Sequence, residues 1–438
     1  MSDPAPAVTR DDRRFWRILL LIALAALALR VAYVAFAKTN QPIHGDQLFY
    51  NAEANRLARG DGFLEPFDPQ ALSRGVIREG KDPAADHPPF TVLVLAPVSF
   101  VTSQALIPQR LTMSVLGTAA VVVIGLVARR LGGDRAGWIA AGIAAIYPNL
   151  WVNDGLIMSE TLATLVVALA LLYAYRLIRE PNIWNALIVG ALCGLGALTR
   201  AELVLLVPLL AVPAALVARS IASAQRWKLA GVGVLAAAVL IAPWVGYNLA
   251  RFDEPTYLST NDGIALLGSN CDSVYFGDGI GLTDLKCLGA NPRGDQSVDS
   301  RIYRDRAFDY IGDHKKRAVL VASARVGRTW SLFRPWDMVS YNKGEGREGW
   351  VTTLGLIAFY PLLVAAVGGW VVMRRRRRRS WPLLVPVLIV TIASAATYGQ
   401  TRFRVPAEPS LVVLAAVAVA AVASRDWPAR QKQPSGNA

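Results

Sequence analysis

The segment HGDQLFYNAE, residues 44–53, comes a few residues after the first long apolar segment of the chain, at about 15–37. It places the carboxylate of Asp46 at the edge of a predicted membrane span. A carboxylate close to a bilayer is costly, and such groups tend to face cavities and mark functional sites. The alternative is that Asp46 caps the short amphipathic helix predicted over 47–59, since Asp is a favoured N-cap residue. Whether other charged or polar residues of the chain lie near Asp46 decides between a functional carboxylate and a helix cap.

The composition is that of a membrane protein. Of the 438 residues, 54% are hydrophobic and 18% are charged, which is too apolar for a water-soluble surface. The formal net charge is +14, and the basic residues gather beside apolar segments, as in the six arginines at 374–379. This pattern is typical of cytoplasmic loops rather than of a nucleic-acid-binding face. We therefore expect an all-α polytopic membrane protein that binds no nucleic acid.

The apolar segments predict about ten transmembrane helices, with both termini on the cytoplasmic side. The segment at 88–107 is expected to be interfacial or re-entrant, because a full crossing would move the basic clusters between 129 and 228 to the outside. The first segment is about 20 apolar residues long with no evident cleavage site, so we expect an uncleaved anchor. The expected spans lie at about 15–37, 109–128, 135–152, 157–178, 183–199, 202–218, 228–249, 350–373, 381–398 and 405–423.

This topology divides the chain into five regions. They are a cytoplasmic tail (1–14), a transmembrane core (15–250) that includes a first outer loop with interfacial helices (38–108), an extracytoplasmic loop region (251–349), C-terminal transmembrane helices (350–423) and a second cytoplasmic tail (424–438). The large loop region is too long for an idle connector, so we expect it to pack over a cavity. It holds Cys271 and Cys287, for which an oxidising compartment predicts a disulfide, whereas Cys193 lies within a span and is expected to be a core residue.

Two further acidic residues are candidates for the same site as Asp46. Glu160 is predicted at the outer end of the fourth span, and Asp154 precedes it in the same segment. Each is a candidate because a carboxylate near a bilayer is costly and tends to mark a functional site.

Basic residues near the outer ends of spans supply candidates for the second half of a site. His87 precedes two prolines at the start of the 88–107 segment, and Arg402 and Arg404 lie between the last two spans. The planar fork of arginine suits a phosphate at the membrane surface, although snorkelling toward lipid headgroups would explain the same positions. Arg200 and Glu202 are expected to pair with each other at a hairpin.

Several common catalytic motifs are missing from the sequence. It has no GxxxxGK[ST] phosphate loop, no GxGxxG after a strand, no HExxH and no GxSxG. An ATP-driven pump, a zinc protease and a serine hydrolase are therefore poorly supported. Nucleotides are not supplied outside the membrane. An enzyme that transfers a chemical group there would therefore have to receive that group, already activated, on a lipid carrier.

Short motifs at the outer ends of the predicted spans resemble those of the GT-C superfamily of membrane glycosyltransferases. The similarity is to the branch with dolichyl-phosphate-mannose protein mannosyltransferases and bacterial lipid A aminoarabinose transferases (glycosyltransferase family 39-like). The motifs are Gly45-Asp46 with Tyr50 and Ala54, GDG at 60–62, HPPF at 87–90, LTRAE at 198–202, PWVGYN at 243–248 and RFRVP at 402–406. Ala201 stands where the family commonly has proline, and Tyr247 replaces its usual arginine.

The resemblance implies a GT-C fold and transfer of a sugar from a polyprenyl-phosphate donor to a hydroxyl of an extracytoplasmic glycolipid, glycopolymer or protein. The family's first-loop aspartate, taken as the general base, corresponds to Asp46. A second acidic residue at the start of a span corresponds to Glu160, which would bind acceptor hydroxyls or a divalent metal. Protein mannosyltransferases have an Asp-Glu pair in the first loop, so Gln47 after Asp46 favours a bacterial glycolipid or glycopolymer enzyme.

The resemblance also assigns the remaining candidates to substrate binding. Arg402 and Arg404, with His87, would hold the leaving phosphate, and the further substrate-binding candidates are Tyr50, Asp154 and Arg200. Carboxylate and His side chains permit a divalent metal, but their spacing requires none. The expected partners are the lipid-linked donor, the hydroxyl-bearing acceptor and membrane lipid. The expected location is the bacterial plasma membrane, with the active site on the extracytoplasmic side.

Two other functions share this topology. A transporter or flippase for lipid-linked sugars should show inverted repeats and helices broken at mid-membrane, and we find no such repeat. A non-catalytic binder of lipid-linked sugars would tolerate the loss of Asp46.

Overall fold

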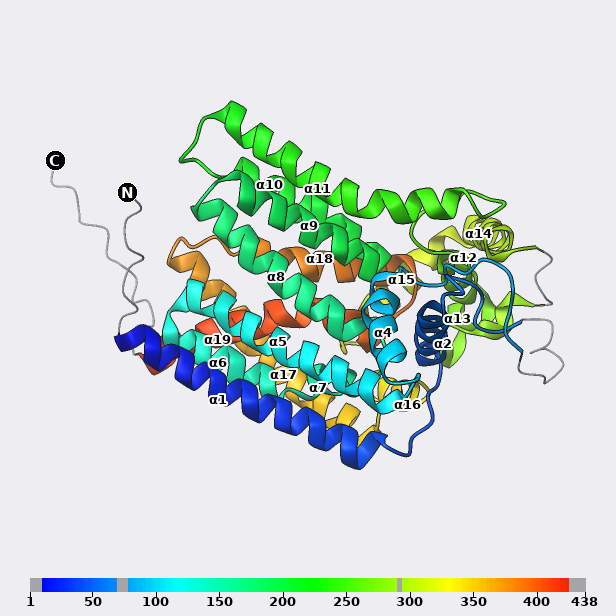
Figure 1. Ribbon diagram of the computed structural model, residues 1–438, viewed down its shortest axis with the longest axis horizontal. Helices are drawn as coiled ribbons and strands as arrows, with labels where there is room; N and C mark the ends of the chain where they lie inside the picture. The colour runs from blue at the N-terminus through cyan, green and yellow to red at the C-terminus, as the bar shows by residue number, and fades with distance from the viewer. Residues whose placement is uncertain (1–9, 69–77, 290–293, 425–438) are drawn as a thin grey trace.

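The computed structural model describes residues 10–68, 78–289 and 294–424, and nearly all of its regular structure is helical (Figure 1). Within these ranges, extended pairing is limited to an isolated antiparallel bridge between Leu64 and Pro83. The predicted all-α class is therefore confirmed.

Six helices of the described residues are long and apolar enough to cross a membrane. They run lengthwise beside one another in Figure 1. A helix of 27 residues is about 40 Å long, which exceeds the hydrocarbon thickness of a bilayer. The six are α1 (Arg10–Tyr33) with its π-helical continuation to Lys38, α5 (Leu106–Gly132), α8 (Ser159–Arg179), α11 (Ser223–Leu249), α17 (Gly349–Arg375) and α19 (Glu408–Ala423) with the 3₁₀ turn η7 before it (Thr401–Ala407).

The other four predicted spans correspond to shorter helices, so the predicted count of ten is not established. The segment at 135–152 is divided because Tyr147 has extended backbone and Pro148 begins a new turn. Pro208 and Pro213 lack backbone donors, which divides the segment after Arg200 into 3₁₀, π and α turns. The shorter elements are α6 (Asp134–Ile146), α7 (Pro148–Trp151), η2 (Asn153–Gly155), α9 (Ile183–Thr199), η3 (Ala201–Leu205), η4 (Val207–Ala211), α10 (Val212–Leu216) and α18 (Trp381–Ala396).

The first outer loop holds two helices that pack on each other at one end of the bundle. They are α2 (Asp46–Arg59) and α4 (Phe90–Val101), and their shared core includes Tyr50, Val92 and Leu95. Helix α4 has 12 residues, about 18 Å, and runs across the direction of the long helices in Figure 1. Its length and direction fit the interfacial segment expected at 88–107.

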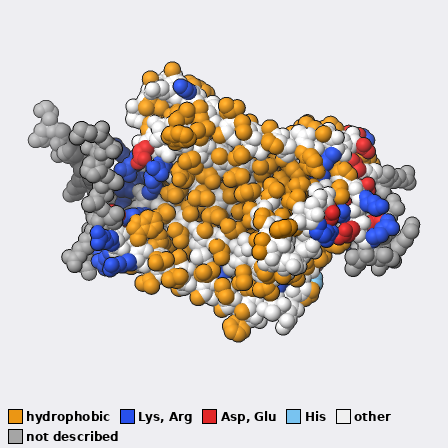
Figure 2. All heavy atoms as spheres, in the orientation of Figure 1, with side chains coloured by type: hydrophobic (Ala, Val, Ile, Leu, Met, Phe, Trp, Pro, Cys, Tyr) orange, Lys and Arg blue, Asp and Glu red, His pale blue; other side chains and the backbone are white. Residues whose placement is uncertain are grey.

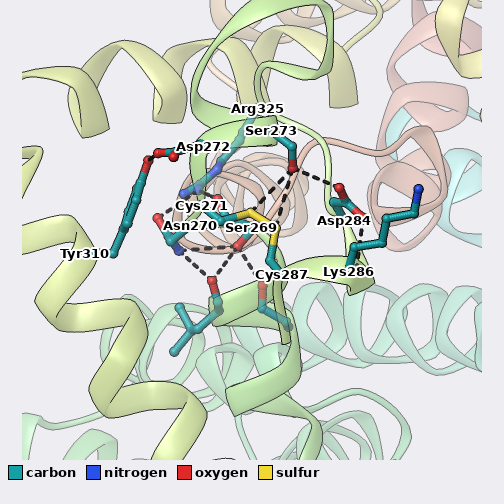
Figure 3. Close-up of a disulfide and its surroundings, with 12 residues drawn as sticks. Ser269, Asn270, Cys271, Asp272, Ser273, Asp284, Lys286, Cys287, Tyr310 and Arg325 are labelled. Atoms are coloured by element: carbon teal, nitrogen blue, oxygen red, sulfur yellow. Dashed lines mark hydrogen bonds between the residues drawn. A yellow bond between two sulfur atoms is a disulfide. The ribbon is translucent and has the colours of Figure 1, made fainter. Parts of the chain in front are cut away.

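The large loop region is a second helical layer at the same end of the molecule as α2 (Figure 1). Its elements are α12 (Asn261–Gly268), α13 (Asp272–Tyr275), η5 (Gly277–Gly279), η6 (Leu285–Leu288), α14 (Gln296–Asp313), α15 (Lys315–Thr329) and α16 (Asp337–Lys343). Figure 3 shows a disulfide between Cys271 and Cys287, whose Cα atoms are 6.2 Å apart. Arg325 on α15 donates to the side chain of Asn270 at 3.0 Å, which joins the disulfide-bonded loop to the helix beneath it.

The face of the molecule drawn in Figure 2 separates into an apolar middle and two charged ends. At the end that carries the N-terminus of α1, Arg378 donates to the carbonyl of Leu131, and the Tyr175 hydroxyl donates to the carbonyl of Arg379 at 2.9 Å. The six-arginine run therefore lies at one end of the bundle, and α2 with Asp46 lies at the other. This apolar band between charged ends is the surface of a multi-pass membrane protein.

Candidate functional site

A cavity of about 760 Å³ lies where α2, the turns after α9, α18 and the large loop region meet. Its polar lining from the helical bundle consists of Asp46, Tyr50, His87, Ser159, Thr199, Arg200, Glu202, Thr397, Tyr398 and Arg402. On the bundle side it also has an apolar wall, formed by Leu205, Ile392, Ala393 and Ala396. The large loop region contributes residues 255–262 and part of α14. The cavity thus has one apolar wall beside the membrane spans and one polar face with charges of both signs.

Arg402 is the centre of the charged face. Its three guanidinium nitrogens each face a different carboxylate: Nη2 lies 2.7 Å from Oδ2 of Asp46, Nη1 lies 2.9 Å from Oε1 of Glu345, and Nε lies 3.7 Å from Oε1 of Glu160. The side chain of Arg402 is 9% exposed and that of Asp46 is 28% exposed. Of this pair, Asp46 is therefore the group that presents more surface to the cavity.

Asp46 is held ionised by its neighbours. Burial by itself would raise the pKa of Asp46, but the charges of Arg402 and His87 and the hydrogen bond from Arg402 outweigh it and hold the pKa below its ordinary range. Asp46 is the first residue of α2, Gly45 is the N-cap, and the helix has no side-chain capping hydrogen bond. The alternative interpretation of Asp46 as a helix cap therefore lacks support.

His87 and Tyr50 form the wall next to Asp46. Their rings stack with centroids 4.7 Å apart and planes at 15°, and Nε2 of His87 lies 3.9 Å from Oδ1 of Asp46. Both residues line the cavity, and their contact with a substrate stays a prediction. Stacking fixes the imidazole plane, so that His87 presents a ring nitrogen toward the carboxylate.

Arg200 forms the pair expected for it and also lines the cavity, while its contact with a substrate stays a prediction. Nε of Arg200 lies 2.6 Å from Oε1 of Glu202, which is the hairpin pair expected from the sequence. Nη1 lies 3.4 Å from Oε1 of Glu160, and the residue also lines the cavity. Its extended backbone between α9 and η3 is what turns the side chain toward the site.

Glu160 lies behind the charged face rather than in it. Its side chain is 1% exposed and does not line the cavity. Three arginines surround its Oε1, namely Arg200 at 3.4 Å, Arg402 at 3.7 Å and Arg347 at 3.9 Å. In this position Glu160 holds the three arginines in place, and its carboxylate cannot reach acceptor hydroxyls in the cavity.

Two of the predicted substrate-binding residues lie outside the cavity. Asp154 is paired with Arg30 at 2.6 Å and accepts a hydrogen bond from Thr161 at 2.7 Å, inside the bundle. Arg404 is paired with Glu408 at 2.7 Å, and its guanidinium lies 3.5 Å from the centroid of the Phe359 ring. Both form buried ion pairs inside the bundle, Asp154 with α1 and Arg404 with a residue one turn further along the same span. Neither side chain lines the cavity, and neither is among the proposed substrate contacts.

The separation of Arg402 from Arg404 follows from the local backbone. Both lie in η7, a 3₁₀ turn, where side chains two residues apart point about 120° from each other. Arg402 therefore faces the cavity while Arg404 faces the interior of the bundle.

Sequence reasoning missed two charged residues of the site. Glu345 contacts Arg402, and Arg347 contacts Glu345 and Glu160 and donates to Oδ1 of Asn153 at 2.9 Å. They lie between α16 and α17, in a polar stretch that was assigned to the loop region as a whole. The signal in the sequence that could have identified these two residues is the high density of charged side chains immediately before a predicted span.

The described residues offer no metal site. Among them, no group of three or more His, Cys, Asp or Glu side chains is arranged to hold a metal ion. The carboxylates near Asp46 instead face arginines.

A family model and several solved structures resemble this chain. Residues 86–247 match the family model of the dolichyl-phosphate-mannose-protein mannosyltransferases. No curated protein sequence matches the chain. The family model is of a mannosyltransferase, in agreement with the predicted enzyme class, a glycosyltransferase.

Two solved structures of an oligosaccharyltransferase from Archaeoglobus fulgidus share the fold. The structure tethered with an acceptor peptide has a TM-score of 0.56 at 15% sequence identity, covering 94% of this chain and 50% of that chain. The structure of AglB in complex with an inhibitory peptide and a dolichol-phosphate has a TM-score of 0.54 at 16% identity, covering 95% and 52%. This chain therefore spans about half the length of these structures, and the predicted GT-C fold is confirmed.

A structure of ArnT from Cupriavidus metallidurans bound to undecaprenyl phosphate is also similar. Its TM-score is 0.43 at 14% identity, covering 93% of this chain and 78% of that chain.

Proposed function

We propose that the protein is a membrane glycosyltransferase that moves a sugar from a polyprenyl-phosphate donor to a hydroxyl of an extracytoplasmic glycolipid, glycopolymer or protein. One observation carries the proposal: the Asp46–Arg402 pair opens onto a cavity that has both an apolar wall and further basic groups. A lipid-linked sugar is a substrate with an apolar chain, an anionic phosphate and a polar sugar. The cavity offers a surface for each of these parts.

The donor fits the cavity with its chain along the apolar wall. Leu205, Ile392 and Ala396 lie on this wall, and they belong to segments that pack within the membrane-spanning bundle. The phosphate would face Arg200 and Arg402, whose fixed charges stabilise the phosphate as negative charge develops on it. The binding of dolichol-phosphate by the oligosaccharyltransferase that shares this fold supports such a ligand.

Asp46 would act as the general base. Its carboxylate accepts the proton of the acceptor hydroxyl as the hydroxyl oxygen attacks the anomeric carbon. The bond between that carbon and the phosphate oxygen breaks, and polyprenyl phosphate leaves with the bonding electrons. A positioned base contributes about 10²- to 10⁴-fold to the rate.

The acceptor would enter from the side of the large loop region. Residues 255–262 and the first turns of α14 form this side of the cavity and supply polar groups. The six-arginine run lies at the opposite end of the bundle, and the positive-inside rule therefore supports a mouth outside the cytoplasm. The proposed location is the bacterial plasma membrane, with the reaction on its outer face.

The test is sugar transfer by purified protein in lipid nanodiscs. A panel of polyprenyl-phosphate sugars and a membrane glycan extract would be offered to the wild type, to Asp46→Asn and to the control Asp61→Asn, which changes an aspartate outside the cavity lining. We expect wild type and control to release polyprenyl phosphate, and Asp46→Asn to do so at least about 100-fold more slowly. Equal turnover in all three proteins would contradict the role of Asp46, and no turnover with any donor would favour a transporter or a binder.

A further inference from the structure

The segment 345–348, between α16 and α17, holds the charged face in place although it does not line the cavity. Its residues contact Arg402, Asn153 and Lys38 of the bundle, and two of them contact Lys38. The contacts are Glu345 to Arg402 (2.9 Å), the Gly346 carbonyl to Lys38, Arg347 to Asn153 (2.9 Å) and Glu348 to Lys38 (2.5 Å). The segment thus ties the end of the large loop region to the start of the first outer loop.

Glu345 is itself fixed on every side. One carboxylate oxygen faces Nη1 of Arg402, and the other accepts from Nη1 of Arg347. The backbone carbonyl of Glu345 accepts from Nε2 of Gln47 at 3.1 Å, and Gln47 is the neighbour of Asp46 on α2. With both oxygens engaged, Glu345 acts on the arginine rather than on a substrate.

The negative charge of Glu345 weakens the electrostatic attraction of Arg402 for an anion. Opposite charges in a partly buried site attract far more strongly than in water, so a carboxylate at 2.9 Å offsets much of the field of the guanidinium. Asp46 has a second neighbour, Nε2 of His87 at 3.9 Å from Oδ1, and Glu160 has two further arginines nearby. Nη2 of Arg402 is therefore the position at which a phosphate can replace Asp46 while Nη1 stays on Glu345.

We propose that Glu345 is a positioning residue of the glycosyl transfer: it fixes Arg402 through Nη1 and weakens the hold of Arg402 on the phosphate, so that the polyprenyl phosphate product can leave. This inference rests on the proposed function, since it takes polyprenyl phosphate as the ligand of the cavity. A phosphate that bound without this opposing charge would dissociate more slowly, and product release limits turnover in many enzymes.

The test compares Glu345→Gln with Glu348→Gln in nanodiscs. The two changes are chemically the same and lie three residues apart, but Glu348 pairs with Lys38 and has no contact with Arg402. The dissociation constant of polyprenyl phosphate is measured by tryptophan fluorescence, together with turnover at saturating donor. Glu345→Gln should bind polyprenyl phosphate about tenfold more tightly and turn over more slowly. Glu348→Gln should lose thermal stability and keep the wild-type dissociation constant within about twofold.

A merely structural role for Glu345 predicts the opposite sign, because a disturbed site binds the phosphate more weakly. Unchanged or weaker binding by folded Glu345→Gln would therefore overturn the inference. Glu345→Asp, which keeps the charge, should bind close to wild type, and Glu345→Ala serves as the neutral variant if Glu345→Gln does not fold. Failure of the wild type to bind polyprenyl phosphate would instead remove the proposed function, and the inference with it.

Discussion

Nη2 of Arg402 donates to Oδ2 of Asp46 at 2.7 Å, although the two residues are 356 positions apart in the chain. Asp46 begins α2 in the first outer loop, and Arg402 lies in η7 just before the last span. The site therefore forms only when the first and last parts of the bundle are assembled. The family match at 86–247 includes His87, Glu160 and Arg200, and the pair at the centre of the site lies outside it.

Replacing Arg402 should change the pH dependence of turnover. Arg402 is the principal charge that holds the pKa of Asp46 below its ordinary range against the effect of burial. In Arg402→Gln the pKa of Asp46 rises, so a larger fraction of the carboxyl groups is protonated at mildly acid pH and cannot accept a proton. We expect the acid limb of kcat/KM to move upward by at least about one pH unit.

The matched control for Arg402→Gln is Arg59→Gln, an arginine of α2 that pairs with Asp61 and Glu79 away from the cavity. Its pH profile should coincide with that of the wild type. If Arg402→Gln reduced turnover with the acid limb unmoved, Arg402 would act on the substrate alone and not on Asp46.

Asp154→Asn should destabilise the protein without affecting donor binding. Asp154 and Arg30 have side chains that are 5% and 1% exposed, so the change leaves a buried arginine unpaired. Breaking such a pair typically costs about 3–5 kcal/mol, whereas replacing both partners by apolar residues is often neutral. Thermal unfolding in detergent should show a large loss for Asp154→Asn and recovery in the double variant Arg30→Met, Asp154→Leu. A loss of polyprenyl phosphate binding at unchanged stability would instead return Asp154 to the substrate site.

Glu65 in the first outer loop should make stability depend on pH. Burial, together with the charges of Asp86 and Asp82, raises the pKa of Glu65 to about 7. The unfolded chain has the lower ordinary value, so the folded protein binds more protons between the two values. Stability from this group is therefore present below about pH 4.5 and is lost as the pH rises to about 7.

Glu65→Gln should remove this dependence. Its melting temperature should match that of the wild type near pH 4.5 and exceed it at pH 8, by an amount equivalent to about 1–3 kcal/mol. Glu79→Gln, which changes an exposed glutamate of the same loop, should show no such trend. A difference between Glu65→Gln and wild type that is the same at both pH values would rule out titration of Glu65 as its cause.

The sequence was sufficient where one property decides the structure. Apolar length predicts the six long helices, although it does not establish the count of ten spans, and the polar stretch with Gly60 predicts α2 over 47–59, within one residue of its observed start at Asp46. The sequence was insufficient where the direction of a side chain decides which residues it contacts. Both Arg402 and Arg404 stand at the end of a span, and only the 3₁₀ geometry of η7 shows that one faces the cavity and the other Glu408.

The same limit applies to Asp154 and Glu345. The sequence shows that Asp154 is a carboxylate near the bilayer, which is costly to bury. It does not show the partner, because Arg30 is 124 positions away and no local pattern joins the two residues. Glu345 lies in a charged stretch that looks like an ordinary polar connector. Its importance comes from the packing of 345–348 against Arg402 and Lys38, which is a property of the tertiary structure.

The position of the donor phosphate beside Asp46 can be tested directly by a cryo-EM structure of the protein with polyprenyl phosphate in nanodiscs. We expect phosphate density within hydrogen-bonding distance of Arg402 and Arg200, with the polyprenyl chain along the wall that holds Leu205 and Ile392. Phosphate density at any other position, with the Asp46–Arg402 pair intact and no ligand in the cavity, would contradict it.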